Sequence, residues 1–295
     1  MKIFLFKISK KFAKKFINLF NRSYLNLKEI FFSLPLLEKP FPCKPFGDKP
    51  NTTRENYLIL HKNAISKKYK KVDLFEKELN HCIDKKWFND LCLYTQTCIK
   101  NSPLNFSHGR ILYTLICKYI EDNIKPESKK ITILETGTAR GFSSLCFSKA
   151  INDKNIQGKV ITIDCIPHNK KIFWNCISDF EGEKTREELL SKWEEELNNI
   201  IFIQGWTIDT LNKIGLNRIH FAFLDAQHTK KSVLEEFKFI YKRQISGDII
   251  FFDDVTPNMF PGVCEAVDYI KINYPYKIKS LNFDRSRGYA IATRI

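Results

Sequence analysis

Short, continuously apolar runs that alternate with helical patterns constrain the fold of this 295-residue chain more than any other feature. The runs that predict strands lie at residues 131–134, 160–163, 200–203, 219–224, 249–252, 276–281 and 289–293. Helical patterns lie among them at residues 142–150, 231–242 and 262–272. Strands that alternate with helices at this spacing predict an α/β fold with a mostly parallel sheet. Helices on both faces of the sheet explain why these runs do not alternate between apolar and polar residues.

Polar residues stand at or directly after the ends of these predicted strands. Ligands of such sheets bind at the carboxyl ends of the strands, near the point where the strand order reverses. Helix capping accounts for one or two acidic residues at such positions, but it explains the whole set poorly. The residues to consider are Glu135, Asp164, Gln204, Asp225, Asp253 and Asp254.

A glycine-containing turn joins the first of these strands to its helix, with the pattern Glu135-x-Gly137-x-x-x-Gly141. Glycines there permit a positive φ and a close approach of a ligand to the backbone. The dinucleotide-binding pattern would require a glycine at position 135, and a glutamate there favours a cationic ligand group over a pyrophosphate. Asp164, which ends the second strand, suits the two hydroxyls of a ribose. A tight turn without a ligand is the alternative.

At these residues the chain resembles class I S-adenosylmethionine-dependent methyltransferases, over about residues 101–295. The motifs that carry the resemblance lie at residues 133–144, 161–164, 204–211, 221–228 and 247–255. Together they look like the metal-dependent O-methyltransferase branch that includes the macrocin and mycinamicin sugar methyltransferases. The resemblance implies a Rossmann-like, mostly parallel seven-stranded sheet with helices on both faces. It also implies that S-adenosylmethionine is held by Glu135, Thr136, Gly137, Gly141, Ser143, Ser144, Asp164, Trp206 and Asp225.

A magnesium site is the second implication of this resemblance. Asp225, Asp253 and Asp254 would be the ligands, and His228, three residues after the first aspartate, would be the catalytic base. Three converging carboxylates need a cation, and oxygen ligands suit Mg²⁺. The family often has another acidic residue shortly after the first aspartate, where this chain has alanine and glutamine. In the alternative interpretation, His228 starts a helix and pairs with Asp225, while Asp254 is a turn residue.

Three further basic residues have less specific signals. His108 precedes the helical pattern at 111–120, in a region that approaches the active site in related enzymes; a structural histidine is the alternative. Arg285 and Arg287 precede the last strand, where they would meet an anionic substrate or else lie in a solvated loop.

Positive charge is concentrated at the start of the chain. The formal net charge is +15, and residues 1–72 hold 17 Lys and Arg against 4 Asp and Glu. On a helix, residues 5–20 would place Phe, Leu and Ile on one face and five lysines on the other, which is typical of a helix that lies on an anionic membrane. The alternative is that this helix packs on the domain or on a second subunit in a homo-oligomer.

We therefore expect three regions. Residues 1–56 would form a basic amphipathic segment and a proline-containing linker, residues 57–125 a helical region packed on the core, and residues 126–295 the S-adenosylmethionine-binding domain. The nine cysteines form no CxxC pair, which favours reduced thiols and a cytoplasmic location. The basic amphipathic segment would place the N-terminus at the inner membrane face.

The leading functional hypothesis is a magnesium-assisted O-methyltransferase for a hydroxyl of a sugar, glycolipid or related small polyol. A nucleic-acid methyltransferase is an alternative that only the overall charge favours. The near-neutral residues 73–295 and the lack of an Asn/Asp-Pro-Pro-aromatic motif count against it. A non-catalytic, membrane-associated scaffold with a methyltransferase fold is the third hypothesis.

Overall fold

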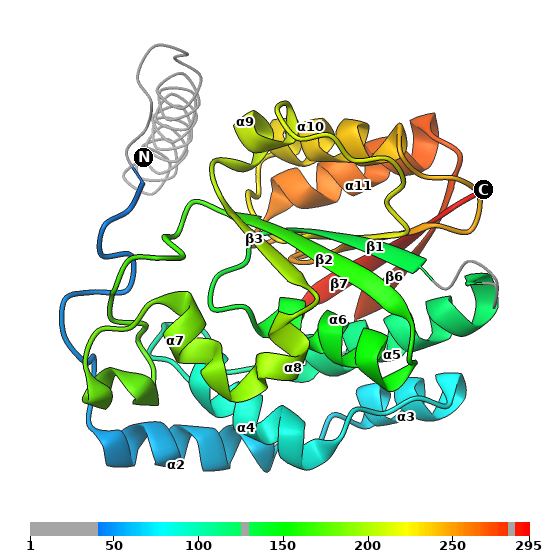
Figure 1. Ribbon diagram of the computed structural model, residues 1–295. Helices are drawn as coiled ribbons and strands as arrows, with labels where there is room; N and C mark the ends of the chain where they lie inside the picture. Colours follow the sequence, from blue (N-terminus) through cyan, green and yellow to red (C-terminus); the bar gives the residue numbers. More distant parts are fainter. Residues whose placement is uncertain (1–40, 125–129, 283–286) are drawn as a thin grey trace, which may run out of the picture. The chain divides into compact units, whose positions relative to one another are not determined.

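Seven strands form one sheet in the order β3-β2-β1-β4-β5-β7-β6 in the computed structural model of this chain (Figure 1). The structure describes residues 41–124, 130–282 and 287–295, so the expectations for residues 1–20 and for Arg285 lie outside it. The strands β1 to β5 are parallel, whereas β7 is antiparallel to both β5 and β6. Their bounds are β1 Lys130–Thr136, β2 Gln157–Asp164, β3 Ile200–Gln204, β4 Phe221–Leu224, β5 Ile249–Phe252, β6 Tyr276–Asn282 and β7 Gly288–Arg294.

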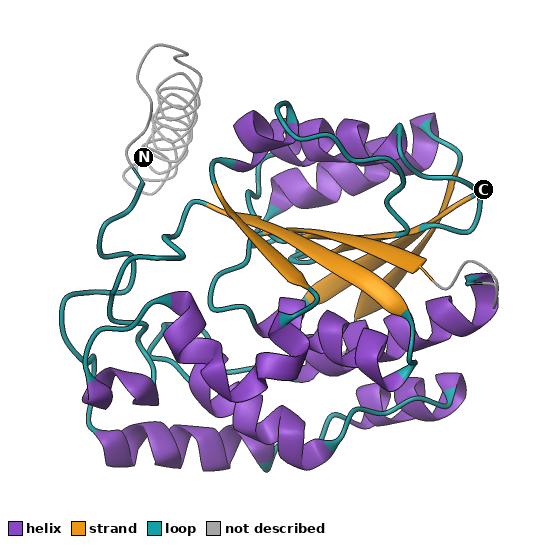
Figure 2. Cartoon of the chain, in the orientation of Figure 1, coloured by secondary structure: helices purple, strands orange, loops and turns teal. Residues whose placement is uncertain are grey.

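Helices cover both faces of this sheet (Figure 2). One face is covered by α9 Thr207–Leu211, α10 Lys230–Tyr241 and α11 Pro261–Asn273. The other is covered by α5 Ser107–Asn123 and α6 Phe142–Asp153. Beyond these two lie α2 Arg54–Ile65, α3 Lys70–Leu79 and α4 Lys85–Thr95. Between β2 and β3 the chain forms η1 Ile177–Glu181, α7 Arg186–Leu190, η2 Ser191–Trp193 and α8 Glu194–Leu197. The expected Rossmann-like fold, with its mostly parallel seven-stranded sheet, is confirmed.

Successive side chains of a strand point to opposite faces of the sheet, so the buried residues form two apolar clusters, one on each face. On β4, Phe221 and Phe223 belong to the cluster beneath α5 and α6, whereas Ala222 and Leu224 belong to the cluster beneath α10 and α11. All four side chains are at most 5% exposed. A strand buried on both faces has no position left for a polar side chain, which is why these sequences are continuously apolar.

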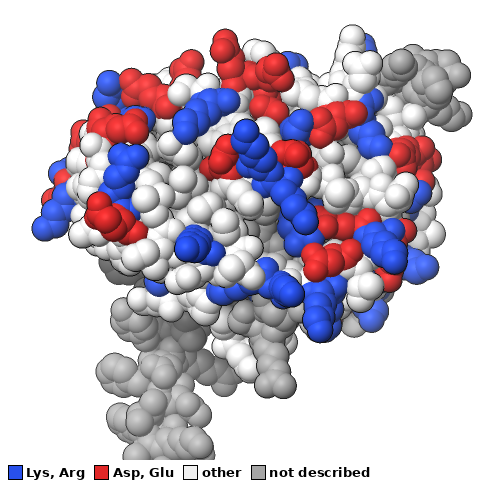
Figure 3. Space-filling view, turned by 90° about the horizontal axis from the view of Figure 1, so that it is seen from below, with Lys and Arg blue, Asp and Glu red and all other residues white. Residues whose placement is uncertain are grey.

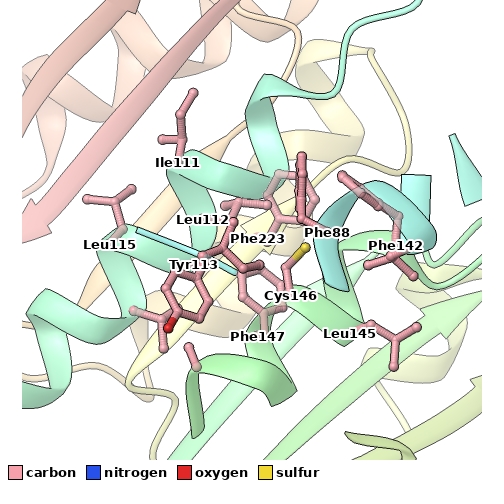
Figure 4. Packing of buried hydrophobic residues seen from close by; sticks show 14 of the residues in the cluster. Phe88, Ile111, Leu112, Tyr113, Leu115, Phe142, Leu145, Cys146, Phe147 and Phe223 are labelled. Atoms are coloured by element: carbon pink, nitrogen blue, oxygen red, sulfur yellow. The ribbon is translucent and has the colours of Figure 1, made fainter. Parts of the chain in front are cut away.

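The helical region before β1 shares the first of these clusters. Phe88 of α4 packs against Phe142 of α6, and α5 lies beside α6 with Leu112 facing Cys146 and Phe147 (Figure 4). Residues 41–295 form one compact unit. The helices α2–α5 therefore share one continuous hydrophobic core with the sheet.

Two surface properties bear on possible partners. On the face seen in Figure 3, Lys and Arg side chains are interspersed with Asp and Glu. Among the helices that the structure describes, none combines the length and the apolar character needed to span a bilayer.

The strand order reverses between β1 and β4. From β1 the order runs to β2 and β3 on one side and to β4 and β5 on the other. The polypeptide leaves these neighbouring strands in opposite directions, so their carboxyl ends leave a crevice where a ligand fits in folds of this kind. Every polar residue that follows the predicted strands lies at this edge.

Candidate active site

The turn after β1 is built on two glycines with positive φ. Gly137 has a φ of +91° and Gly141 one of +88°. The Gly137 N–H donates to the carbonyl of Ile163 on β2 over 2.9 Å. A Cβ atom on Gly137 would overlap the backbone carbonyl of Asp225, because the turn crosses directly beside the end of β4. Gly141 is the N-cap residue of α6.

Glu135 lies beneath this turn and is fully buried. The hydroxyls of Ser143 and Ser144, in the first turn of α6, both donate to its carboxylate. Burial raises the pKa of Glu135 to about 7, against the effect of these hydrogen bonds. Three of the residues predicted to hold the cofactor therefore contact one another and stabilise the strand-to-helix turn.

Thr136 points to the opposite face of the sheet. Its hydroxyl donates to Glu236 of α10 over 2.9 Å, and both side chains are at most 1% exposed. Burial raises the pKa of Glu236 to about 8. Sequence reasoning did not single out Glu236, although a glutamate between Val233 and Ile240 on the apolar face of a predicted helix is a usable signal.

Asp164 and the glycine turn are joined by hydrogen bonds. The N–H of Ala139 donates to one oxygen of Asp164 over 2.6 Å, and the N–H of Ile166 donates to the other over 2.9 Å. Arg186, which is 2% exposed, donates from Nε to the Ala139 carbonyl over 3.1 Å and from its second terminal nitrogen to the Ile166 carbonyl over 3.3 Å. Arg186, missed at the sequence level, fixes both segments that flank Asp164.

Trp206 lies beside this edge on the neighbouring strand connection. Gln204, the last residue of β3, is in register with Asp164 on β2. Trp206 follows two residues later, directly before α9, and its ring centroid is 6.1 Å from that of Phe41.

Asp225, His228 and Asp254 form the second group of the site. Asp225 follows β4, and Asp254 follows β5 with a φ of +56°. Nε2 of His228 lies 3.0 Å from Oδ2 of Asp254 and 3.9 Å from Oδ1 of Asp225. The two carboxylates raise the pKa of His228 to about 10, so the ring is protonated at neutral pH when nothing else offsets their charge.

Asp253 does not join this group. Its carboxylate is fully buried and accepts two hydrogen bonds from Arg287, over 2.6 Å and 3.2 Å. Oδ1 of Asp254 lies 3.8 Å from Nε of Arg287. The structure thus differs from the expected three-aspartate arrangement, because the guanidinium beside β7 compensates Asp253 and the side chain of Asp254 turns toward His228.

The donor atoms of Asp225, His228 and Asp254 fit a divalent cation. One ligand atom from each residue lies within 4.8 Å of the other two, and this is the one such group among the described residues. Carboxylate oxygens suit Mg²⁺ or Mn²⁺, so Asp225 and Asp254 would be the ligands, with His228 beside them. The observed group therefore suits a divalent ion. Asp225 and Asp254 belong both to this group and to the set of ligands expected from the sequence.

His108 lies at the start of α5 and is 5% exposed. Its ring packs edge-on against Phe142, with the centroids 4.7 Å apart. Burial, together with the nearby Arg287 and Lys100, holds its pKa well below the usual value.

Two comparisons with known proteins find that the chain is similar to methyltransferases. Residues 134–255 match the family described as a methyltransferase domain. A search of curated proteins finds no match to the chain. The O-methyltransferase TomG from Streptomyces achromogenes, involved in tomaymycin synthesis and solved with S-adenosylmethionine, has a TM-score of 0.52 at 16% identity, covering 77% of this chain and 96% of its own. An O-methyltransferase from Bacillus cereus, solved with S-adenosylhomocysteine, has a TM-score of 0.52 at 15% identity, covering 77% of this chain and 98% of its own.

The sheet order, the glycine turn and the matched domain agree with one another. Residues 134–255 form a methyltransferase domain within this Rossmann-like fold. At these identities the solved structures establish the fold, and the acceptor of the methyl group must be argued from the site.

Proposed function

We propose that this chain is an S-adenosylmethionine-dependent O-methyltransferase that acts, with a divalent metal ion, on a hydroxyl of a sugar, glycolipid or related polyol. The supporting observation is that the glycine turn with Asp164 and the group of Asp225, His228 and Asp254 lie at the ends of neighbouring strands. The cofactor is supported by TomG and the Bacillus cereus enzyme, which were solved with S-adenosylmethionine and its demethylated product. The sugar class rests on the sequence resemblance alone.

The glycine turn and Asp164 would hold the cofactor. S-adenosylmethionine would supply the methyl group: the acceptor oxygen would bond to the methyl carbon in line with the carbon–sulfur bond, which breaks as the thioether S-adenosylhomocysteine leaves. Asp164 accepts one hydrogen bond at each carboxylate oxygen, and an ionised carboxylate has about four lone-pair sites, so it can still accept from ribose hydroxyls. The positive φ of Gly137 and Gly141 opens the backbone to a close ligand. Trp206, beyond the strand next to Asp164, is suited to pack against the adenine.

Asp225 and Asp254 would hold the metal ion, which when bound acts as a Lewis acid and orients the acceptor hydroxyl. His228 lies against both carboxylates, which together keep it protonated. A cation bound by the two carboxylates would offset their negative charge, and this would remove the cause of the raised pKa of His228. An imidazole near its reference pKa of about 6.5 can then take the proton of the hydroxyl at neutral pH.

Calorimetric titration of the full-length protein tests both halves of this proposal. S-adenosylmethionine and Mn²⁺ are titrated separately into the wild type, Asp164→Asn, Asp254→Asn and the control Asp268→Asn, which changes an exposed carboxylate on α11. We expect Asp164→Asn to weaken cofactor binding about tenfold or more, the equivalent of about 1.4 kcal/mol. Asp254→Asn should weaken Mn²⁺ binding and leave cofactor binding intact.

The outcomes separate the alternatives. If the wild type binds no cofactor, the methyl-transfer proposal fails and the scaffold hypothesis takes its place. If the cofactor binds but Mn²⁺ binds equally to the wild type and Asp254→Asn, the metal-assisted part fails while methyl transfer stands.

A further inference from the structure

Arg287 lies against both of the consecutive aspartates that follow β5. Its guanidinium donates to the two oxygens of Asp253, over 2.6 Å and 3.2 Å, and its Nε lies 3.8 Å from Oδ1 of Asp254. The side chain of Asp253 is fully buried, whereas those of Arg287 and Asp254 are 21% and 17% exposed. A buried carboxylate without a partner is costly, so the guanidinium fixes Asp253 in this position.

Asp253 in turn holds the backbone of Asp254. Oδ1 of Asp253 accepts a hydrogen bond from the N–H of Asp254 over 2.7 Å. Asp254 has a φ of +56°, in the left-handed region that residues other than glycine adopt only rarely. Such a conformation persists only where the surrounding structure supports it. A carboxylate that is itself held by two hydrogen bonds supplies this support.

The segment that carries Arg287 is fixed to the same turn through its backbone. The N–H of Val255 donates to the carbonyl of Gly288 over 2.9 Å, and the N–H of Gly288 donates to the hydroxyl of Thr256 over 3.2 Å. A Cβ atom on Gly288 would overlap the carbonyl oxygen of Val255, so the two segments touch here. The position of Arg287 relative to Asp254 is therefore set by contacts on both sides of the turn.

These contacts orient the carboxylate of Asp254. Its Oδ1 faces Arg287, while its Oδ2 lies 3.0 Å from Nε2 of His228. The ring of His228 stacks on Phe260, with the centroids 4.4 Å apart. One oxygen of Asp254 thus belongs to the group with Asp225 and His228 whose donor atoms suit a divalent ion.

We infer that Arg287, acting through Asp253, is the positioning residue that turns Asp254 toward the metal ion. This inference rests on the proposed function, since it concerns the metal-binding group of that site. The guanidinium provides the positive charge that Asp253 would otherwise take from the metal ion, and Asp253 acts on the ion only through the backbone of Asp254. Groups that hold a metal ligand by hydrogen bonds typically contribute about 10- to 100-fold to metal affinity.

A matched ion pair at the other end of β5 provides the control. Arg218 donates to both oxygens of the buried Asp248, over 2.8 Å and 3.2 Å, and this carboxylate also accepts from the N–H of Ile245 over 2.8 Å. Asp248 directly precedes β5, whereas Asp253 directly follows it, so the control pair lies at the opposite edge of the sheet. An arginine-to-lysine change in either pair keeps the positive charge but loses the planar, two-donor geometry.

The experiment compares the full-length wild type with Arg287→Lys and Arg218→Lys. Mn²⁺ alone is titrated into each protein after bound metal has been removed with EDTA, and free Mn²⁺ is measured by its electron paramagnetic resonance signal. Calorimetry gives the affinity of the same samples for S-adenosylmethionine. Arg287→Lys should weaken Mn²⁺ binding about tenfold or more and change cofactor affinity by about twofold or less, while Arg218→Lys retains both. Because lysine keeps the charge, such a loss reports the orientation of Asp254.

The remaining outcomes overturn the inference or separate it from the proposed function. Mn²⁺ binding by Arg287→Lys that equals or exceeds that of the wild type overturns the inference and leaves the proposed function standing. An equal loss in Arg218→Lys, or a loss of both Mn²⁺ and cofactor affinity in Arg287→Lys, also overturns it, because Arg287 would then support the fold in general. If the wild type binds Mn²⁺ but no S-adenosylmethionine, methyl transfer fails while the Mn²⁺ comparison still decides the role of Arg287. A wild type that binds S-adenosylmethionine but no Mn²⁺ refutes both the inference and the metal-assisted part of the proposed function.

Discussion

Glu236 is a buried carboxyl group on α10 whose environment favours its protonated form. Thr136 donates to one of its oxygens, and the other has no partner among the described residues. Its pKa is raised from 4.5 to about 8, chiefly by burial. The folded protein therefore holds a proton that the unfolded chain releases between about pH 4.5 and pH 8. Over that window the free energy of unfolding falls as the pH rises.

Glu236→Gln should remove this part of the pH dependence. The difference in unfolding free energy between the variant and the wild type should shift in favour of the variant by about 2–4 kcal/mol from pH 5 to pH 9, since each unit of pKa shift is worth about 1.4 kcal/mol. Urea titrations at four pH values in EDTA measure it, and Glu235→Gln controls for the lost negative charge. Parallel pH profiles of the wild type and Glu236→Gln would contradict the assignment of a buried, protonated Glu236.

At the residue scale, sequence spacing predicts the approach of Asp225, His228 and Asp254 but not the partner of Asp253. Asp225 and Asp254 come together because they follow the neighbouring parallel strands β4 and β5, and His228 lies three residues after Asp225. The pairing of Asp253 with Arg287 depends on β7 lying antiparallel beside β5, with the N–H of Val255 bonded to the carbonyl of Gly288. That placement is a tertiary property with no local sequence signal.

At the element scale, α5 lies close to α6 where Gly109 faces Phe142. A Cβ atom at Gly109 would lie 2.5 Å from Cζ of Phe142 and 2.9 Å from a ring carbon of Phe88. Figure 4 shows these two phenylalanines side by side between the helices. Glycine therefore allows the two helices to approach, despite its low helix propensity.

Gly109→Ala should destabilise the protein by about 1–3 kcal/mol through overpacking. In an exposed helix the same change would stabilise by about 1 kcal/mol, so the sign of the effect distinguishes close packing from propensity. Urea unfolding measures it, and the double variant Gly109→Ala, Phe142→Leu should recover part of the loss because leucine lacks the clashing ring atoms. Stabilisation by Gly109→Ala would refute the close contact.

The regular elements follow from the sequence, whereas the segment between β2 and β3 does not. Apolar or β-branched runs of four or more residues predict the parallel strands β1 to β5, because the strands inside the sheet are buried on both faces. The edge strand β6 differs, since its residues Lys277, Lys279 and Ser280 are exposed. The helices η1, α7, η2 and α8 are three to five residues long. A helix of one turn shows no apolar periodicity. The capping box of Thr185 and Glu188 marks the start of α7 in the sequence, but it does not indicate that Arg186 contacts the glycine turn.

At the scale of the whole molecule, the basic N-terminal segment and the methyltransferase body are separable in composition. Residues 1–40 contain 9 Lys and Arg against 2 Asp and Glu. Residues 41–295 form a compact unit that contains every described strand and helix. The membrane hypothesis assigns binding of anionic lipid to the first part and cofactor binding to the second.

Deletion of residues 1–40 should therefore abolish flotation with vesicles that contain anionic lipid, and leave the melting temperature and S-adenosylmethionine affinity of the remaining chain unchanged. Each lysine or arginine near an anionic membrane contributes about 1 kcal/mol, and the effect decays within a Debye length. Flotation of the full chain should accordingly fall between 0.05 and 0.5 M salt and be absent with neutral vesicles. Equal flotation of the full and the shortened chain would place lipid binding in residues 41–295, and no flotation of either would end the membrane hypothesis. A loss of cofactor affinity on deletion would instead show that residues 1–40 support the folded body, as expected if their apolar face packs on protein.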